Sequence, residues 1–165
     1  MRVVIQRVAH AKVCIDGEVH SQIGNGLLVL LGIQPTDGQD DIDYLVQKIT
    51  HLRIFDDAAG VMNLCVRDVA GEVLVVSQFT LMASTRKGNR PSYIHAAPPA
   101  VAEPLYEDFV KQLLHCNGET RADGPIWRRH AGVASQRRAG DNLHRLAPPR
   151  IVPVCPSFQG RGRTA

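Results

Sequence analysis

Four side chains that could hold or cleave a ligand stand together in Ser77-Gln78-Phe79-Thr80, directly after an apolar β-type run that ends at Val76. Polar groups at the end of a buried strand need a partner, which is either the protein itself or a ligand. If the chain turns after Val76, backbone N–H groups of Gln78, Phe79 and Thr80 could stabilise an oxyanion while the ring of Phe79 stacks on a flat ligand. On the residues alone, a strand end satisfied by internal hydrogen bonds is the better supported reading.

A nucleophilic role for Thr80 would need a general base, and the nearest histidine in the sequence is His95. The histidines are scattered without ligand or triad spacing, so surface or structural roles are favoured for His10, His20, His51 and His95. A group supplied by the substrate, or a positioned water, then has to assist the reaction.

A basic loop follows shortly after Thr80. It places Arg86, Lys87 and Arg90 beside Ser92 and Tyr93. Cations next to an aromatic ring suit phosphate and ribose, whereas a solvated turn is the alternative. The closeness of this loop to Ser77-Gln78-Phe79-Thr80 favours a binding role.

Hydrophobic periodicity predicts the elements that must position these residues. Strands are expected over residues 2–8, 11–15, 26–33, 53–55, 62–66 and 72–81, with a hairpin-type turn at Asp16-Gly17 and a central strand at 26–33. Helices are expected over 40–52, with apolar residues three and four apart, and over 101–114, with the stripe Val101, Leu105, Phe109 and Leu113. This pattern predicts a single α+β domain with most of its sheet before residue 82.

Composition limits the class of protein. Of the 165 residues, 44% are hydrophobic, which is enough to fill one core. The sequence shows no export signal and no apolar run long enough for a membrane span. A soluble, unexported protein is expected. The four cysteines lack Cys-x-x-Cys or Cys/His spacing, so we expect reduced, mostly buried thiols and no zinc at Cys14, Cys65, Cys116 and Cys155.

The net charge of +3 conceals two unlike parts. Residues 1–120 carry a net charge of −4, whereas residues 121–165 hold nine arginines, no lysine and two aspartates, a net charge of +7. After Leu114 no strand or helix period is sustained, so we expect a poorly ordered tail. A basic tail suggests nucleic-acid affinity, but lysine normally shares that role.

The chain resembles the D-aminoacyl-tRNA deacylase family over residues 1 to about 114. The matching segments are residues 4–8 with 11–13, 24–32, 53–56 with 62–64, 75–81 ending in Ser-Gln-Phe-Thr-Leu, and Arg90-Pro91-Ser92. The resemblance implies a mixed sheet or barrel with two main helices, a cytoplasmic homodimer without cofactor or metal, and hydrolysis of the ester joining a D-amino acid, or glycine, to the terminal adenosine of tRNA. It assigns Ser77, Gln78, Phe79 and Thr80 to the catalytic site, and Arg7, Arg86, Lys87, Arg90 and Ser92 to substrate binding. Because Thr80 has no evident base, a mechanism that uses the ribose 2′-hydroxyl fits better than a threonine nucleophile.

One family element is missing. Members carry Asn-x-Gly-Pro-x-Thr near the C-terminus, and its Gly-Pro unit rejects L-amino acids; Gly124-Pro125 lacks that context. Residues 124–146, back-translated with permitted codons and read one nucleotide later, can encode GRFGADMRVSLVNDGPVTTFID, which contains the motif. We therefore interpret residues 1–114 as an incomplete catalytic domain and residues 115–165 as an out-of-frame tail, with a frameshift between about Leu114 and Gly124.

Other classes of function stay open on the sequence. A non-catalytic RNA-binding protein could use the arginine-rich tail. An inactive remnant of the deacylase is a second alternative. An esterase for small acyl esters is a third, although a small neutral ester offers no phosphate to the basic loop.

Overall fold

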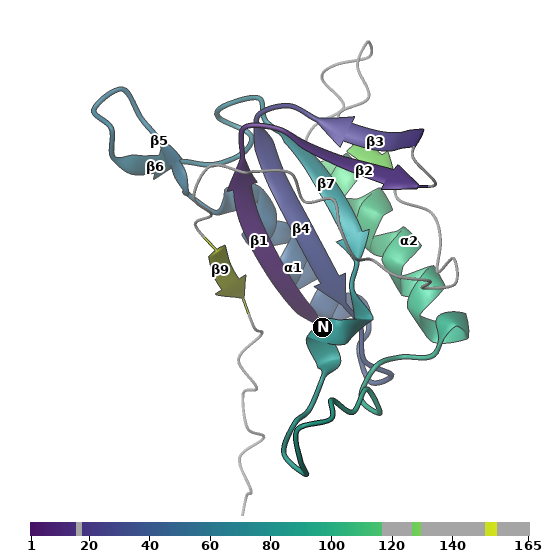
Figure 1. Cartoon of the computed structure of the whole chain (residues 1–165). Coiled ribbons are helices and arrows are strands. Elements are labelled where there is room, and N and C mark those ends of the chain that lie inside the picture. The colour runs from purple at the N-terminus through teal and green to yellow at the C-terminus, as the bar shows by residue number, and fades with distance from the viewer. Residues whose placement is uncertain (16–17, 117–126, 130–150, 155–165) are drawn as a thin grey trace, which may run out of the picture.

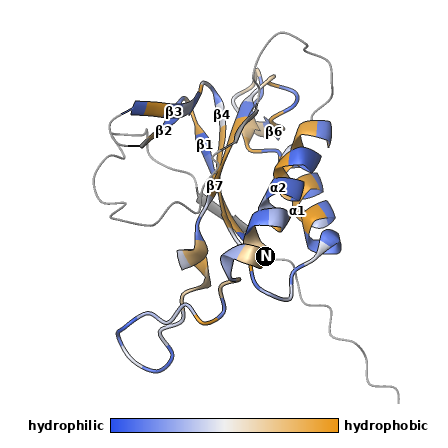
Figure 2. Cartoon of the chain, turned by 90° about the vertical axis from the view of Figure 1, so that its right-hand side faces the viewer, coloured by the Kyte–Doolittle hydropathy of each residue, from blue (hydrophilic) through white to orange (hydrophobic). Residues whose placement is uncertain are grey.

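The computed structural model describes residues 1–15, 18–116, 127–129 and 151–154. Its centre is a five-stranded sheet, with helices α1 (Gln39–His51) and α2 (Pro99–Cys116) on one face and the β2–β3 pair on the other (Figures 1 and 2). The predicted α+β class with two main helices is thereby confirmed. None of the helices in the described part of the chain combines the length and apolarity of a membrane span.

The large sheet has the strand order β8-β7-β4-β1-β9. Its bounds are β1 Arg2–Val8, β4 Gly26–Gly32, β7 Glu72–Ser77, β8 Trp127–Arg129 and β9 Ile151–Val154. The central strand β4 runs antiparallel to β1 and parallel to β7, so the sheet is mixed, as expected. Its described strands form an open sheet rather than a barrel.

Strand β4 is buried on both faces because apolar residues fill every position between its glycines. Leu27, Val29 and Leu31 join the main core under the helices, whereas Leu28 belongs to a smaller core beneath the β2–β3 pair. Gly26 is required by close packing, since an added Cβ would lie 1.8 Å from the carbonyl oxygen of Glu72. The start of β4 therefore packs directly against the start of β7.

The helical layer differs from the expected stripe in one respect. Phe109 and Leu113 of α2 are buried as predicted, but Val101 is 36% exposed and Leu105 only half-buried. Tyr106 and Val110 complete the buried face, because residues three and four apart in α2 share one side with Phe109 and Leu113. Helix α1 buries Ile42, Leu45, Val46, Ile49 and Thr50.

Two small sheets complete the described structure. The hairpin of β2 (Ala11–Ile15) with β3 (Glu18–Ile23) adds a strand that the sequence pattern did not specify, and its expected turn at 16–17 lies outside the described residues. Strands β5 (Phe55–Asp56) and β6 (Met62–Leu64) form a short pair. Strand β5 is shifted from the predicted strand at 53–55, and β6 is shorter than the predicted strand at 62–66.

Two predictions are corrected here. The strand expected over 72–81 ends at Ser77, and a 3-10 helix, η1 (Phe79–Met82), follows it. The cysteines are not mostly buried: Cys65 is buried, Cys116 is partly covered, Cys14 is exposed, and Cys155 lies outside the described residues. Cys14 is exposed because it lies on the small β2–β3 pair, next to a bulge.

Most of the predicted tail lies outside the described residues. Within it the structure describes β8, parallel to β7 from Val73 to Val75, and β9, antiparallel to β1 from Val3 to Gln6. These two short segments pair with the backbone edges of β7 and β1, which offer free hydrogen-bonding groups to an extended chain.

Candidate functional site at the end of β7

Ser77 is the last residue of β7, and the chain then turns away from the sheet. The N–H of Gln78 still donates to the carbonyl oxygen of Leu31 at 2.7 Å, so the last link to β4 is closed there. From Phe79 onward the backbone winds into η1, in which Leu81 N–H donates to the Gln78 carbonyl at 3.2 Å.

Gly32, at the end of β4, makes room for this turn. A Cβ at this position would lie 3.0 Å from the Cβ of Leu81 and 3.1 Å from the carbonyl oxygen of Gln78. The glycine therefore lets η1 pack directly against the end of the central strand.

The turn leaves two backbone donors available. The first N–H groups of a helix have no acceptor within that helix. Among the described residues, no acceptor contacts the N–H of Phe79 or of Thr80. The sequence predicted three such donors, but the Gln78 N–H is used by Leu31, so the structure supports two.

The polar side chains of the strand end partly satisfy each other. Gln78 Nε2 donates to Thr80 Oγ1, and both residues are half-buried, whereas Ser77 is exposed. Within the described part of the chain no histidine, carboxylate or lysine side chain hydrogen-bonds to Thr80. The side chains of Gln78 and Thr80 therefore satisfy each other in part, whereas the backbone N–H groups of Phe79 and Thr80 have no acceptor among the described residues.

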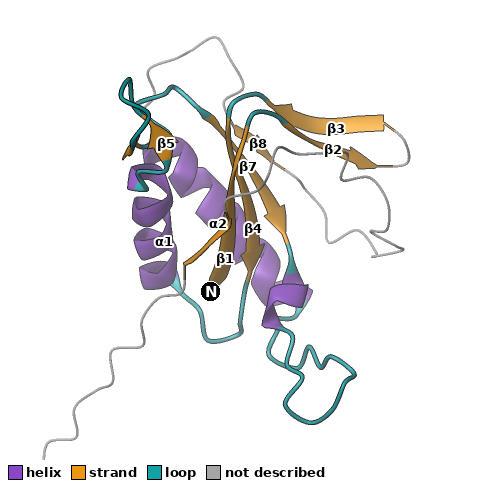
Figure 3. Cartoon of the chain, turned by 60° about the vertical axis from the view of Figure 1, so that its left-hand side comes forward, coloured by secondary structure: helices purple, strands orange, loops and turns teal. Residues whose placement is uncertain are grey.

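Phe79 presents an aromatic surface beside these donors. Its side chain is 36% exposed, and its ring lies 5.1 Å from that of Tyr93 at an interplanar angle of 71°. Tyr93 comes from the loop that leaves η1 and projects beyond the end of the sheet (Figure 3). The predicted proximity of this loop to the strand end is thus present in the structure.

The basic loop is closed at its base by Ser84 and Ser92. Each donates its N–H to the other's carbonyl at 2.9 Å. Arg86, Lys87 and Arg90 lie on the exposed part between them. The loop therefore carries three exposed cations and contacts Phe79 through Tyr93, while the backbone of Ser92 belongs to the closing ladder.

Arg7 is not brought to this site. Its guanidinium donates to the carbonyl of Ile54 at 2.8 Å and pairs with Asp56 at 3.0 Å. The residue of β1 that contacts η1 is Arg2. Arg7 lies five positions further along the strand, about 16 Å away in an extended chain. Its substrate-binding role stays a sequence-based prediction.

Arg2 is a residue that the sequence reasoning missed. Its Nη1 donates to the carbonyl oxygen of Leu81 at 3.0 Å and so holds η1 against the first strand. The contact joins residues 79 positions apart, and no local pattern could have revealed it.

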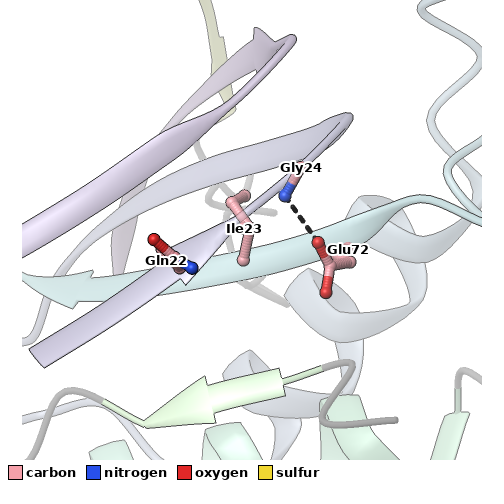
Figure 4. Close-up of a pocket in the computed structure, with 4 residues that line it drawn as sticks. All are labelled: Gln22, Ile23, Gly24 and Glu72. Atoms are coloured by element: carbon pink, nitrogen blue, oxygen red, sulfur yellow. Dashed lines mark hydrogen bonds between the residues drawn. The ribbon is translucent and has the colours of Figure 1, made fainter. Parts of the chain in front are cut away.

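A hollow lies at the opposite end of β7. Gln22, Ile23, Gly24 and Glu72 line a space of about 340 Å³, and Glu72 Oε2 accepts from the Gly24 N–H at 2.5 Å (Figure 4). This glutamate is already used by the turn between β3 and β4. Among the described residues, no group of three His, Cys, Asp or Glu side chains could hold a metal ion.

The fold and the strand end together define an α+β protein with backbone donors, an exposed ring and a basic loop at one end of a mixed sheet. The model of the family described as D-Tyr-tRNA(Tyr) deacylase matches residues 4–134. The chain belongs to this family.

Curated relatives agree with that assignment. A D-aminoacyl-tRNA deacylase of Bacteroides thetaiotaomicron is 56% identical over 124 residues, covering 75% of this chain and 83% of the relative. One from Porphyromonas gingivalis is 64% identical over 113 residues, covering 68% and 75%.

Two solved structures share the fold. A "c-Myc DNA Unwinding Element Binding Protein" aligns with a TM-score of 0.67 and 43% identity over 70% of this chain and 78% of its own. A probable eukaryotic D-amino acid tRNA deacylase aligns with a TM-score of 0.59 over 71% of this chain and 68% of its own. At 18% identity, this likeness supports the fold alone.

Proposed function

We propose that this chain hydrolyses the ester of D-aminoacyl-tRNA to free D-amino acid and tRNA, as an editing step in translation. The observation that carries the proposal is the turn after Ser77, where two backbone N–H groups that find no acceptor among the described residues stand beside the exposed ring of Phe79. Membership of the deacylase family supports the same substrate.

The backbone donors would stabilise the charge that develops in the reaction. Water attacks the ester carbonyl carbon, and the N–H groups of Phe79 and Thr80 donate to the carbonyl oxygen as it becomes an oxyanion. When the tetrahedral intermediate collapses, the 3′-oxygen of the ribose leaves and takes a proton, with the neighbouring 2′-hydroxyl relaying protons between water and leaving group. The 2′-hydroxyl of the substrate thereby takes the role of a general base, for which Thr80 has no partner among the described residues.

Binding would rest on the ring and the loop. Phe79 stacks on the terminal adenine, and Arg86, Lys87 and Arg90 contact phosphates of the tRNA end. By the family resemblance we also propose glycyl-tRNA as a second substrate, a homodimer as the assembly, and the cytoplasm, where aminoacyl-tRNA is used, as the location.

We further propose that residues 1–114 form the catalytic domain and that residues 115–165 are translated out of frame. The alignment with the Porphyromonas gingivalis relative is 113 residues long and covers 68% of this chain, which supports this division, whereas the family match runs on to residue 134. The change of charge after residue 120 and the out-of-frame string that contains Asn-Asp-Gly-Pro-Val-Thr support the same division.

Hydrolysis of D-tyrosyl-tRNA should be compared with that of D-tyrosine ethyl ester. We expect the tRNA ester to be cleaved faster than its spontaneous rate and the free ester to stay near its own, because the ethyl ester lacks adenine, 2′-hydroxyl and phosphates. Equal acceleration of both esters would instead identify a small-ester esterase.

The second candidate is a nucleic-acid-binding protein without hydrolytic activity. Its support is that the solved structure at 43% identity is named as a DNA-binding protein, together with the arginine-rich segment of this chain. Loss of RNA affinity on deletion of residues 121–165, with no deacylation by the full chain, would favour this candidate.

A further inference from the structure

The exposed ring of Phe79 rests on a second ring from the loop. Tyr93 meets it in an edge-to-face arrangement, with centroids 5.1 Å apart and planes at 71°. Both rings keep a free surface, since Phe79 is 36% and Tyr93 39% exposed. Such a contact restricts the directions in which an exposed ring can point.

Tyr93 itself is fixed by the backbone around it. The ladder between Ser84 and Ser92 closes just before it. Its carbonyl accepts from the Ala96 N–H at 2.9 Å, and Ala97 N–H donates to the carbonyl of Ile33, beyond the end of β4, at 2.9 Å. The residue is therefore tied to the same end of the sheet as η1, although the loop around it is exposed.

Phe79 is held less firmly by its own element. It is the first residue of a four-residue 3-10 helix whose N-cap residue, Gln78, makes no side-chain capping hydrogen bond to the helix backbone. Short 3-10 turns are weakly stabilised, so an exposed side chain at the start of one has more than one accessible orientation. Among the described residues, Tyr93 is the aromatic partner of this ring.

We propose that Tyr93 is a positioning residue that holds the Phe79 ring in the orientation needed to stack on the flat base of the substrate. The inference rests on the proposed function, since it concerns how that substrate is bound. The contact is made by the aromatic ring, so a phenylalanine at position 93 should serve as well as the tyrosine.

The test compares Tyr93→Ala, Tyr93→Phe and Ile94→Ala. Ile94 is the matched control because it is the next residue and is 80% exposed. We expect Tyr93→Ala to raise KM for D-tyrosyl-tRNA about three- to tenfold with little change in kcat, the size of an aromatic pair. Tyr93→Phe and Ile94→Ala should keep the wild-type KM. A wild-type KM in Tyr93→Ala, or a loss in Tyr93→Phe equal to that in Tyr93→Ala, would overturn the proposal.

A second readout needs no substrate. Fluorine NMR of chain labelled with 4-fluorophenylalanine reports Phe79 directly, with its signal assigned by Phe79→Leu. Tyr93→Ala should shift or broaden that signal, whereas Ile94→Ala should leave it unchanged; an unaltered signal in Tyr93→Ala would refute the positioning role. A wild-type chain that hydrolyses no D-tyrosyl-tRNA would overturn the proposed function instead, and the NMR result would still decide the orientation of the ring.

Discussion

Two possible mechanisms assign different roles to Thr80. Its hydroxyl accepts from the Gln78 amide, and no base among the described residues contacts it. In the backbone-donor mechanism, Thr80 contributes an N–H that survives Thr80→Ala, so we expect kcat to fall by about tenfold or less. A nucleophilic hydroxyl would instead lose at least about 10³-fold. Single-turnover deacylation of D-tyrosyl-tRNA distinguishes these two results.

The terminal 2′-hydroxyl offers the complementary test. If this hydroxyl relays the proton, D-tyrosyl-tRNA ending in 2′-deoxyadenosine should be hydrolysed about 10²-fold more slowly or worse, the usual size of a general acid–base contribution. Its KM should change little, because the base and the phosphates are intact. Equal kcat for the two substrates would contradict the relay.

At the scale of elements, the packing of η1 on β4 decides where the donors point. Gly32→Ala would push its Cβ into Leu81 and the Gln78 carbonyl, which lie 3.0 and 3.1 Å from that position. Because small displacements of reacting groups are costly, we expect kcat to fall about tenfold or more. Gly38→Ala is the matched control, since its Cβ would meet nothing within 4 Å. A Gly32→Ala chain with wild-type kcat would show that η1 does not position the donors.

A hydrogen-bonded cluster joins the two helices. Asp43 Oδ1 accepts from Gln112 at 2.6 Å and from Gln39 at 2.7 Å. These bonds, that of Gln112 first, hold the pKa of Asp43 below its usual value of 3.8.

The lowered pKa sets the sign of a pH dependence. A carboxylate with a lowered pKa stabilises the fold above its unfolded pKa, and this stabilisation is lost as pH falls through the folded pKa. We therefore expect the Tm of the wild type to exceed that of Asp43→Asn at pH 7, and the difference to shrink below about pH 4. Calorimetry between pH 7 and about pH 2.5 measures it; a difference that grows on acidification would contradict the assignment.

Much of the element layout could be predicted from the chain, for physical reasons that differ by element. The run of residues 26–33 is apolar at nearly every position, and its short length and bounding glycines favour a central strand over a helix. The end of β7 could not be placed, because Phe79-Thr80-Leu81 has β-type residues and the turn depends on contact with Gly32. The contacts of Arg2 with Leu81 and of Phe79 with Tyr93 join distant segments, so periodicity carries no signal of them.

At the scale of the whole molecule, the chain joins the segment that we propose is catalytic to a segment of unlike composition. The strand end, the ring and the basic loop all lie between Ser77 and Tyr93. The element that would tell D- from L-amino acids is expected in the segment that we propose is out of frame. Catalysis and chiral selection should therefore be separable in this protein.

Resequencing the gene between the codons for about Leu114 and Gly124 tests that division at its source. We expect an inserted or deleted base relative to the gene of a functional relative. A restored frame should encode the Asn-Asp-Gly-Pro-Val-Thr string. An uninterrupted frame identical in phase to the relative's gene would rule out the frameshift.

The most direct test of the central claim is a deacylation assay on matched D- and L-tyrosyl-tRNA, run with this chain and with a frame-restored version. We predict that both versions hydrolyse D-tyrosyl-tRNA above its spontaneous rate, and that restoring the frame increases the preference for D over L by at least about tenfold. Spontaneous rates for the D-substrate with both versions would contradict the account.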